Sequence, residues 1–146
     1  MSNLQTLADH VELLALQAEF TDAGMQGDFD GFASQFTARG IWRIPGIGVE
    51  FVGREQIRAG IERLKESWEF FVQTAHPGVI ELSGDTARGR VYIAEFGRLR
   101  DGGSHSNHAI YHDRYERTEQ GWRFAARSYE VRYMDTAPLT GSPPQR

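Results

Sequence analysis

Apolar residues recur every three or four positions along the first part of the chain, which predicts a helix from Asn3 to about Gln26. One apolar stripe consists of Leu4, Leu7, Ala8, Val11, Leu14, Ala15 and Ala18. A second stripe lies on another side of this helix and consists of Leu13, Leu16 and Phe20. We therefore expect the helix to be covered on two sides. Gly24 and Gly27 end it, and Asp28 caps a second helix over Phe29–Phe36.

Short alternating runs predict β-strands in most of the remaining chain. The expected elements are strands 41–44 and 49–52, a helix from Gly53 to about Ser67, and strands 70–82 and 86–100. His76-Pro77-Gly78 interrupts the third of these strands, and Pro and Gly inside such a run indicate a bulge or a bend.

The end of the domain reads as a β-hairpin formed by Ala109–Thr118 and Trp122–Tyr133 around Glu119-Gln120-Gly121. A three-residue loop that ends in Gly would pair Thr118 with Trp122. This register places Asp113 opposite Arg127, and Tyr111 opposite Tyr129. One face then carries Tyr111, Asp113, Tyr115, Arg127, Tyr129 and Val131. The other face carries Ile110, His112, Trp122, Phe124 and Ala126. A loop longer by one residue would move Arg127 to the other face.

The order of these elements predicts a single α+β domain over residues 1–134, followed by a flexible tail over 135–146 that is rich in Pro, Gly, Ser and Thr. We expect a cone-shaped barrel, in which a strongly curved antiparallel or mixed sheet wraps around the long N-terminal helix with two further helices. Such a sheet encloses a concave pocket, the usual kind of site for a small molecule.

The composition narrows the classes of function. The 146 residues include no cysteine and carry a net charge of −4, so disulfides and thiolate chemistry are excluded and the protein is expected to be cytoplasmic. The N-terminus lacks a basic segment followed by an apolar core, so we expect no signal peptide, and the sequence contains no run of ~18 apolar residues that would predict a membrane helix. Interspersed charges argue against a nucleic-acid or membrane surface. We expect a small apolar molecule as ligand and a second copy of the chain as partner in a homodimer.

Several segments in this order resemble the nuclear transport factor 2-like superfamily, specifically its SnoaL-like polyketide cyclase branch. They are Phe20 with Gly27–Asp30 and Phe36, then Gly40–Trp42, Phe51–Ile57 and Tyr111–Arg127. Within that branch the chain is similar to the hexachlorocyclohexane dehydrochlorinases and, more distantly, to the scytalone dehydratases. The resemblance implies proton abstraction assisted by a histidine, with no metal and no organic cofactor.

The resemblance also implies which residues react. Thr74–Gly78 looks like the segment that carries the family histidine, which makes His76 the candidate base, and Arg127 matches a pocket arginine that would stabilise negative charge. The family acid that orients the histidine is replaced here by Met25, and Asp22 lies one turn earlier and is the candidate substitute. Each candidate has a structural alternative: His76 could be a neutral histidine at a bulge, Arg127 could form a salt bridge to Asp113, and Asp22 could be a solvated acid.

Apolar and aromatic residues are the candidate substrate-binding walls, with ordinary core packing as the alternative. They are Phe20, Met25, Trp42, Tyr92, Phe96, Tyr111 and Tyr129. Glu95 is expected to face outward, although a place in the pocket stays possible. His105, His108 and His112 are candidate metal ligands: His108 and His112 would lie about 13 Å apart on an extended strand, too far to share a metal ion, whereas His105 with His108 stays possible in a loop. The resemblance, together with these candidate residues, implies a cofactor-independent cyclase, dehydratase or isomerase, with a non-catalytic ligand-binding or assembly module as the alternative.

Overall fold

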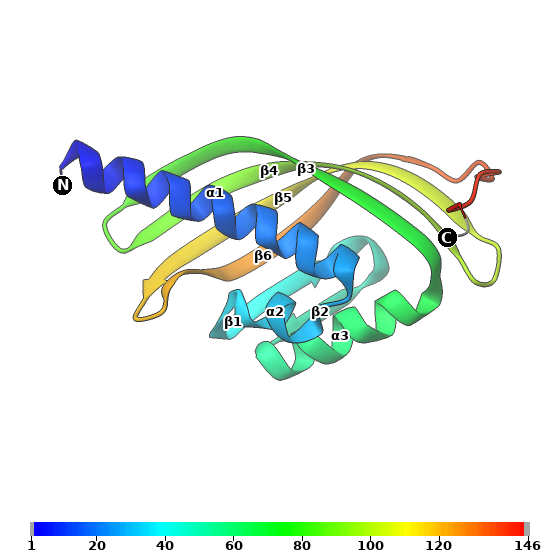
Figure 1. Ribbon diagram of the computed structural model, residues 1–146, viewed down its shortest axis with the longest axis horizontal. Coiled ribbons are helices and arrows are strands. Elements are labelled where there is room, and N and C mark those ends of the chain that lie inside the picture. The colour runs from blue at the N-terminus through cyan, green and yellow to red at the C-terminus, as the bar shows by residue number, and fades with distance from the viewer. Residues whose placement is uncertain (1, 145–146) are drawn as a thin grey trace.

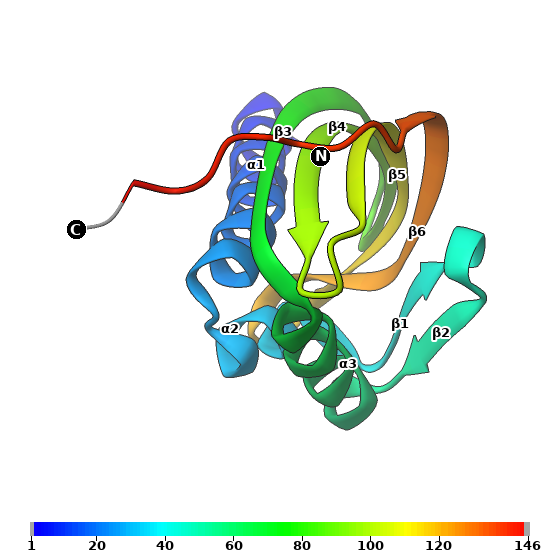
Figure 2. The same ribbon diagram turned by 90° about the vertical axis from the view of Figure 1, so that its right-hand side faces the viewer.

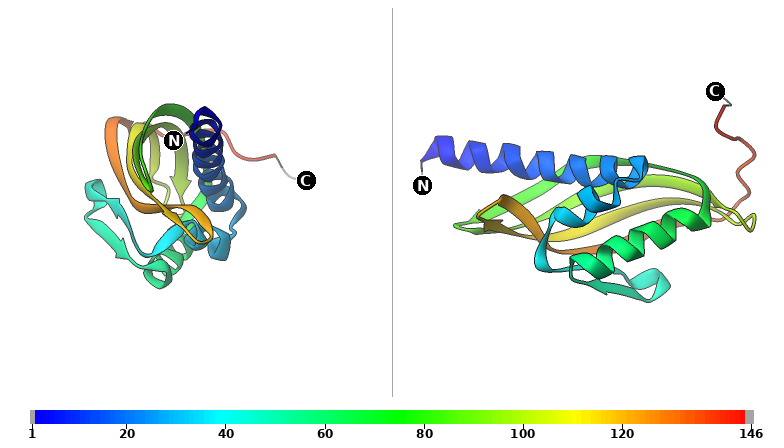
Figure 3. Two further views of the ribbon diagram at one scale, coloured as in Figure 1. Left: turned by 90° about the vertical axis from the view of Figure 1, so that its left-hand side faces the viewer. Right: turned by 60° about the horizontal axis from the view of Figure 1, so that its bottom comes forward.

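Three α-helices and a six-stranded sheet form the computed structural model, which describes residues 2–144 (Figure 1). The helices are α1 (Asn3–Gln26), α2 (Phe29–Ser34) and α3 (Arg54–Ser67). The strands are β1 (Phe36–Ile44), β2 (Val49–Val52), β3 (Trp68–Ser83), β4 (Thr86–Leu99), β5 (Ser104–Thr118) and β6 (Gly121–Asp135), with a short 3-10 helix η1 (Pro45–Ile47) before β2. α1 runs along the sheet, and α2 and α3 lie near the C-terminal end of α1 (Figure 3).

The sheet is mixed and open, in the order β2-β1-β6-β5-β4-β3. β1 runs parallel to β6, and the other neighbouring pairs are antiparallel. Figure 2 shows the long strands following a strong curve from β3, past β4 and β5, to β6. This arrangement confirms the predicted α+β cone. The register shift between Pro77 and Ile80 in β3 also confirms the expected bulge after His76.

The end of α2 and the start of β1 differ from the prediction. The Asp28 side chain accepts a hydrogen bond from the Gly31 N–H at 2.9 Å and caps α2, as expected. However, α2 ends at Ser34, and β1 begins at Phe36 rather than at Ile41. Phe36 pairs with Phe124 of β6, so a tertiary contact with a distant strand extends β1 backwards.

The β5–β6 hairpin reaches the expected cross-strand pairs by a different route. Thr118 pairs with Gly121, which has φ 101°, so the turn is one residue shorter than predicted. A bulge between Phe124 and Ala126 in β6 then restores the pairs Asp113–Arg127 and Tyr111–Tyr129. Because the bulge shifts the alternation by one residue, Trp122 and Phe124 are buried in the core together with Arg127. Their predicted placement on the opposite face is wrong.

Of the two apolar stripes of α1, one is buried and the other is exposed. Leu13, Leu16 and Phe20 are buried against the sheet. The stripe that begins at Leu4 points away from the core and is exposed, with exposed fractions of 78% at Leu4, 61% at Leu7, 60% at Val11 and 40% at Leu14. The expectation that both sides of α1 are covered is therefore wrong for this protomer.

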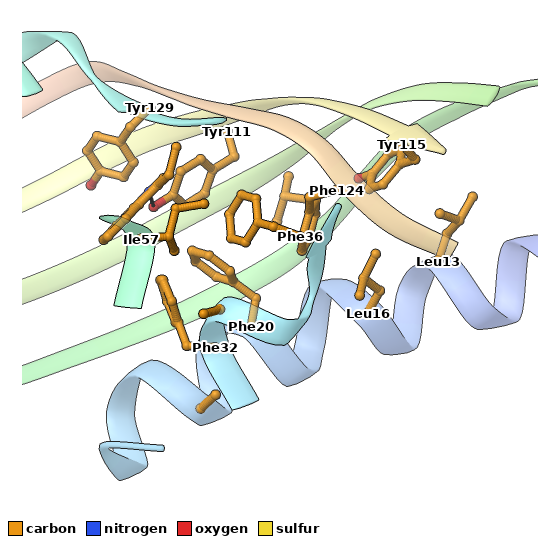
Figure 4. Packing of buried hydrophobic residues seen from close by; sticks show 14 of the residues in the cluster. Leu13, Leu16, Phe20, Phe32, Phe36, Ile57, Tyr111, Tyr115, Phe124 and Tyr129 are labelled. Carbon is orange, nitrogen blue, oxygen red and sulfur yellow. Dashed lines mark hydrogen bonds between the residues drawn. The ribbon is translucent and has the colours of Figure 1, made fainter. Parts of the chain in front are cut away.

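Aromatic side chains fill the core between α1 and the sheet (Figure 4). The Phe20 ring lies 4.3 Å from Phe32 and 5.7 Å from Phe124, measured between centroids. Near the N-terminal end of α1, the buried Asp9 binds two nitrogens of Arg117 at 2.7 and 3.0 Å and accepts a third bond from Trp122 Nε1 at 3.1 Å. These contacts fix α1 on the sheet. Among residues 2–144, no helix is long and apolar enough to cross a bilayer.

Candidate functional site

A cavity of about 430 Å³ opens beside the C-terminal end of α1, against the concave face of the sheet. Its walls are mainly apolar and aromatic, and they include Phe20, Met25, Trp42, Phe71, Tyr111 and Val131. The exposed side chains of Ile47 and Met134 also border it, so the cavity opens to solvent on that side. A space of this size and lining fits a small ring compound.

The polar groups of the cavity converge on one carboxylate, that of Glu95. His105 Nε2 lies 3.2 Å from Glu95 Oε2. The Tyr129 hydroxyl donates a short hydrogen bond to Oε1 of the same carboxylate, and Gln73 Nε2 donates another at 3.3 Å. Asn107 also lines the cavity, and its Oδ1 is buried without a hydrogen-bond partner among the described residues. Acid, imidazole and phenol therefore meet in an otherwise apolar hollow.

Strand alternation and register explain why these groups meet. Val91 and Ile93 of β4 are buried in the core, and Glu95 follows them on the same face. On β5, Asn107 lies opposite Glu95, and His105 lies opposite Gly97. A Cβ atom at Gly97 would come within 3.1 Å of His105 Cε1, so the missing side chain leaves room for the imidazole beside the carboxylate.

Burial keeps both cavity phenols protonated. It raises the pKa of Tyr129 well above its usual range, and the negative charge of Glu95 raises it further. Burial is also the main reason for the raised pKa of Tyr111, whose hydroxyl accepts a hydrogen bond from Trp42 Nε1 at 3.1 Å. Tyr129 is therefore a neutral hydrogen-bond donor to Glu95 throughout the physiological range.

The two residues proposed from the sequence as base and orienting acid lie outside the cavity. His76 is exposed on the outer face of β3, and its nearest polar side-chain partner is Thr74 Oγ1 at 3.5 Å. Asp22 is exposed on α1, and its carboxylate makes no hydrogen bond to another side chain among the described residues. The expectation that the His76 imidazole points into the hollow is wrong, because alternation along β3 turns Gln73 inward and His76 outward.

Arg127 is a core residue and does not line the cavity. Its Nε and Nη2 donate to Asp113 at 2.7 and 3.1 Å, and both side chains are fully buried. The guanidinium carbon lies 4.4 Å from the Phe20 centroid and 4.0 Å from the Tyr111 centroid. Both rings line the cavity and Arg127 does not, so the alternative drawn from the sequence, a salt bridge to Asp113, is what the structure shows for Arg127.

Of the predicted wall residues, Phe20, Met25, Trp42, Tyr111 and Tyr129 line the cavity. Tyr92 and Phe96 do not, because they lie on the outer face of β4 with exposed fractions of 44% and 42%. Met25 Sδ accepts a hydrogen bond from the Gln73 N–H at 3.3 Å, so the thioether occupies the place expected for an acid.

Sequence reasoning missed His105 as a cavity residue and expected Glu95 to face outward. The signal for Glu95 was its spacing of two and four residues from Ile93 and Val91, which is the spacing of one strand face. For His105 no such signal existed, because its strand was expected to start only at Ala109.

Within residues 2–144, no group of three or more His, Cys, Asp or Glu side chains could hold a metal ion.

A model of the SnoaL-like domain matches residues 5–128, which is most of the chain. The chain belongs to the SnoaL-like domain family. This membership confirms the nuclear transport factor 2-like superfamily suggested by the sequence motifs. Among curated proteins, none matches the chain.

Several solved structures share the fold of almost the whole chain. The sequence of LinA, whose crystal structure is known, is 26% identical to this chain. The two structures give a TM-score of 0.88, and the match covers 99% of this chain and 100% of LinA. The hexachlorocyclohexane dehydrochlorinase LinA-type3 from Novosphingobium barchaimii LL02 is 24% identical, with a TM-score of 0.87 over 98% and 100%. A putative scytalone dehydratase from Novosphingobium aromaticivorans DSM 12444 is 12% identical, with a TM-score of 0.82 over 98% and 97%.

Proposed function

We propose that this SnoaL-like protein is a cofactor-independent lyase or isomerase that removes a proton from a small, apolar, cyclic or polyketide-like molecule bound in the cavity. One observation carries the proposal. Glu95 is the only carboxylate and His105 the only imidazole among the described residues that line the cavity, and the two are hydrogen-bonded. A paired acid and imidazole in an apolar hollow is the arrangement that general base catalysis requires.

The roles follow from the contacts of the pair. The Glu95 carboxylate accepts a hydrogen bond from His105 Nε2–H, which leaves the lone pair on Nδ1 to take a proton from the substrate. The imidazolium formed in this step is stabilised by the adjacent carboxylate, as in triads in which an acid orients a histidine. Tyr129 and Gln73 donate to the opposite oxygen of Glu95 and fix its orientation.

The lining also indicates what the substrate carries. An acceptor that stays buried without a partner costs about 1–3 kcal/mol, so a ligand that donates a hydrogen bond to Asn107 Oδ1 gains affinity. The aromatic walls suit the body of a ring, and the hydroxyl or N–H group of that ring would meet Asn107. The dehydrochlorinase and the putative scytalone dehydratase among the similar structures support elimination as the reaction type.

Proton exchange tests the base without knowledge of the natural substrate. We would incubate the protein with 2-tetralone in D₂O and follow loss of the α-proton signals by NMR. The wild-type protein is expected to accelerate exchange over buffer, and His105→Ala and Glu95→Gln are expected to reduce this acceleration by at least about a hundredfold, the lower end of what general base catalysis contributes. His76→Ala is the matched control, because it removes an imidazole from the outer face.

Two outcomes would contradict the assignment: full exchange activity in His105→Ala, or loss of activity in His76→Ala. The second candidate function is a binding module, and it is favoured by Met25, whose thioether stands where the family places its acid. Saturable binding of 2-tetralone with no acceleration of exchange by the wild-type protein would support that function instead.

A further inference from the structure

The outward stripe of α1 consists of Leu4, Leu7, Ala8, Val11, Leu14, Ala15 and Ala18, and every one of these residues is exposed. It lies opposite the buried face of the same helix, which carries Leu13, Leu16 and Phe20. With four large side chains, the stripe presents on the order of 500 Å² of apolar surface, which is as large as the largest apolar patch on a typical soluble monomer. Patches of this size are often interaction sites.

The spacing of the stripe identifies the kind of partner. Leu4, Leu7, Val11, Leu14 and Ala18 alternate steps of three and four residues, which is the heptad pattern of helices that pack along their whole length. The occupant is therefore another helix. α1 contains no Lys or Arg, so it lacks the basic flank that would attract an anionic membrane surface.

We propose that the stripe packs against the same stripe of a second copy of this chain, with the two α1 helices antiparallel and crossing at Val11. The seven positions are symmetric about Val11, because 4 and 18, 7 and 15, and 8 and 14 are each equally far from it. Two antiparallel copies related by a two-fold axis at Val11 therefore cover both stripes from end to end. A self-complementary patch is what a two-fold interface requires.

The sizes of the side chains agree with this geometry. At about 100° per residue, Leu7 and Leu14 lie on one edge of the stripe and Ala8 and Ala15 on the other. The two-fold axis brings each edge against the same edge of the partner, so leucines meet leucines and alanines meet alanines. The alanine edge lets the helices approach closely while the leucine edge fills the space. Two stripes together bury about 1,000 Å², the lower size limit of a specific interface.

The mass of the protein in solution, measured by light scattering after size exclusion, tests the interface. The wild-type chain is expected at twice its 16.5 kDa. Val11→Glu is expected to give monomers with an unchanged circular dichroism spectrum, because Val11 is exposed in the single protomer. The matched control is Tyr92→Glu, which places the same charge on the exposed outer face of β4 and should leave the dimer intact. A wild-type monomer at high micromolar concentration, or a dimer lost in Tyr92→Glu and kept in Val11→Glu, would overturn the proposal.

Crosslinking tests the orientation of the helices, and the absence of native cysteines makes the experiment clean. Val11→Cys is expected to form a disulfide dimer on mild oxidation, because residue 11 meets its own copy at the two-fold axis. Leu4→Cys alone should stay uncrosslinked, whereas an equal mixture of Leu4→Cys and Ala18→Cys should form a heterodimer. Self-crosslinking of Leu4→Cys would indicate parallel helices and refute the antiparallel arrangement.

Discussion

Removal of the Asp113 charge should destabilise the protein strongly, because Arg127 would then be a buried cation without a counter-charge. Asp113 accepts hydrogen bonds from Arg127 Nε at 2.7 Å, Arg127 Nη2 at 3.1 Å and the Tyr115 hydroxyl at 2.7 Å. Asn at this position keeps the volume but loses the charge. Breaking a fully buried pair from one side costs about 3–5 kcal/mol, a large share of the 5–15 kcal/mol that stabilises a domain.

Urea unfolding followed by tryptophan fluorescence measures this loss as a lower midpoint at an unchanged slope. The control is Asp85→Asn, which removes an exposed carboxylate from Arg117 and should cost no more than about 1 kcal/mol. A combined replacement of Asp113 and Arg127 by apolar residues should cost less than the two single changes together. If Asp113→Asn lowers the free energy of unfolding by less than about 1 kcal/mol, Arg127 is not held as a buried ion pair.

Two further changes test the acid response and the β3 bulge. Arg117 holds the pKa of Asp9 well below its usual range, so this carboxylate stabilises the fold fully above about pH 4 and loses that contribution as the pH falls towards its folded-state pKa. Asp9→Asn should therefore be less stable than the wild type at pH 7, and the difference in unfolding free energy should shrink on acidification. In β3, Gly78→Ala should lower the free energy of unfolding by about 1–3 kcal/mol, because the new Cβ would lie 2.2 Å from Arg90 O. Gly46→Ala is the control, because open space surrounds that position, and it should change the free energy of unfolding little. Thermal unfolding measures both variants.

The hairpin shows how a prediction can reach the right contact through two local differences. The sequence predicts the pair Asp113–Arg127 from a three-residue loop, whereas the structure combines a shorter turn with a bulge in β6. The two shifts cancel for Arg127 but not for Phe124, which lies between the turn and the bulge. No residue type near Ala126 marks the bulge, so the faces of this short segment could not be predicted from alternation alone.

The two stripes of α1 show what periodicity can and cannot decide. Periodicity identified the helix and both of its apolar sides, and α1 has the predicted bounds. It could not tell which side faces the sheet, because a stripe that meets a second protein chain and a stripe that meets the core have the same pattern. Phe20 of the inward stripe joins the aromatic core, but leucine occurs on both stripes, with Leu13 buried and Leu7 exposed, so residue type alone does not separate the two sides.

The position of the imidazole shows why resemblance to a family locates a cavity better than it locates a reacting group. The fold fixes the hollow, because the curve of the sheet and the end of α1 bound it whatever residues line the walls. The reacting groups need only converge there, and any inward position on a neighbouring strand can supply them. In this chain β3 offers Gln73 inward and α1 offers Met25, while Glu95 and His105 come from β4 and β5 across the same space. An acid–imidazole pair on adjacent antiparallel strands is also held more rigidly than one shared between a helix and a strand, since the ladder between β4 and β5 fixes both backbones. Under the proposed function, proton abstraction in this cavity depends on the geometry of that strand pair.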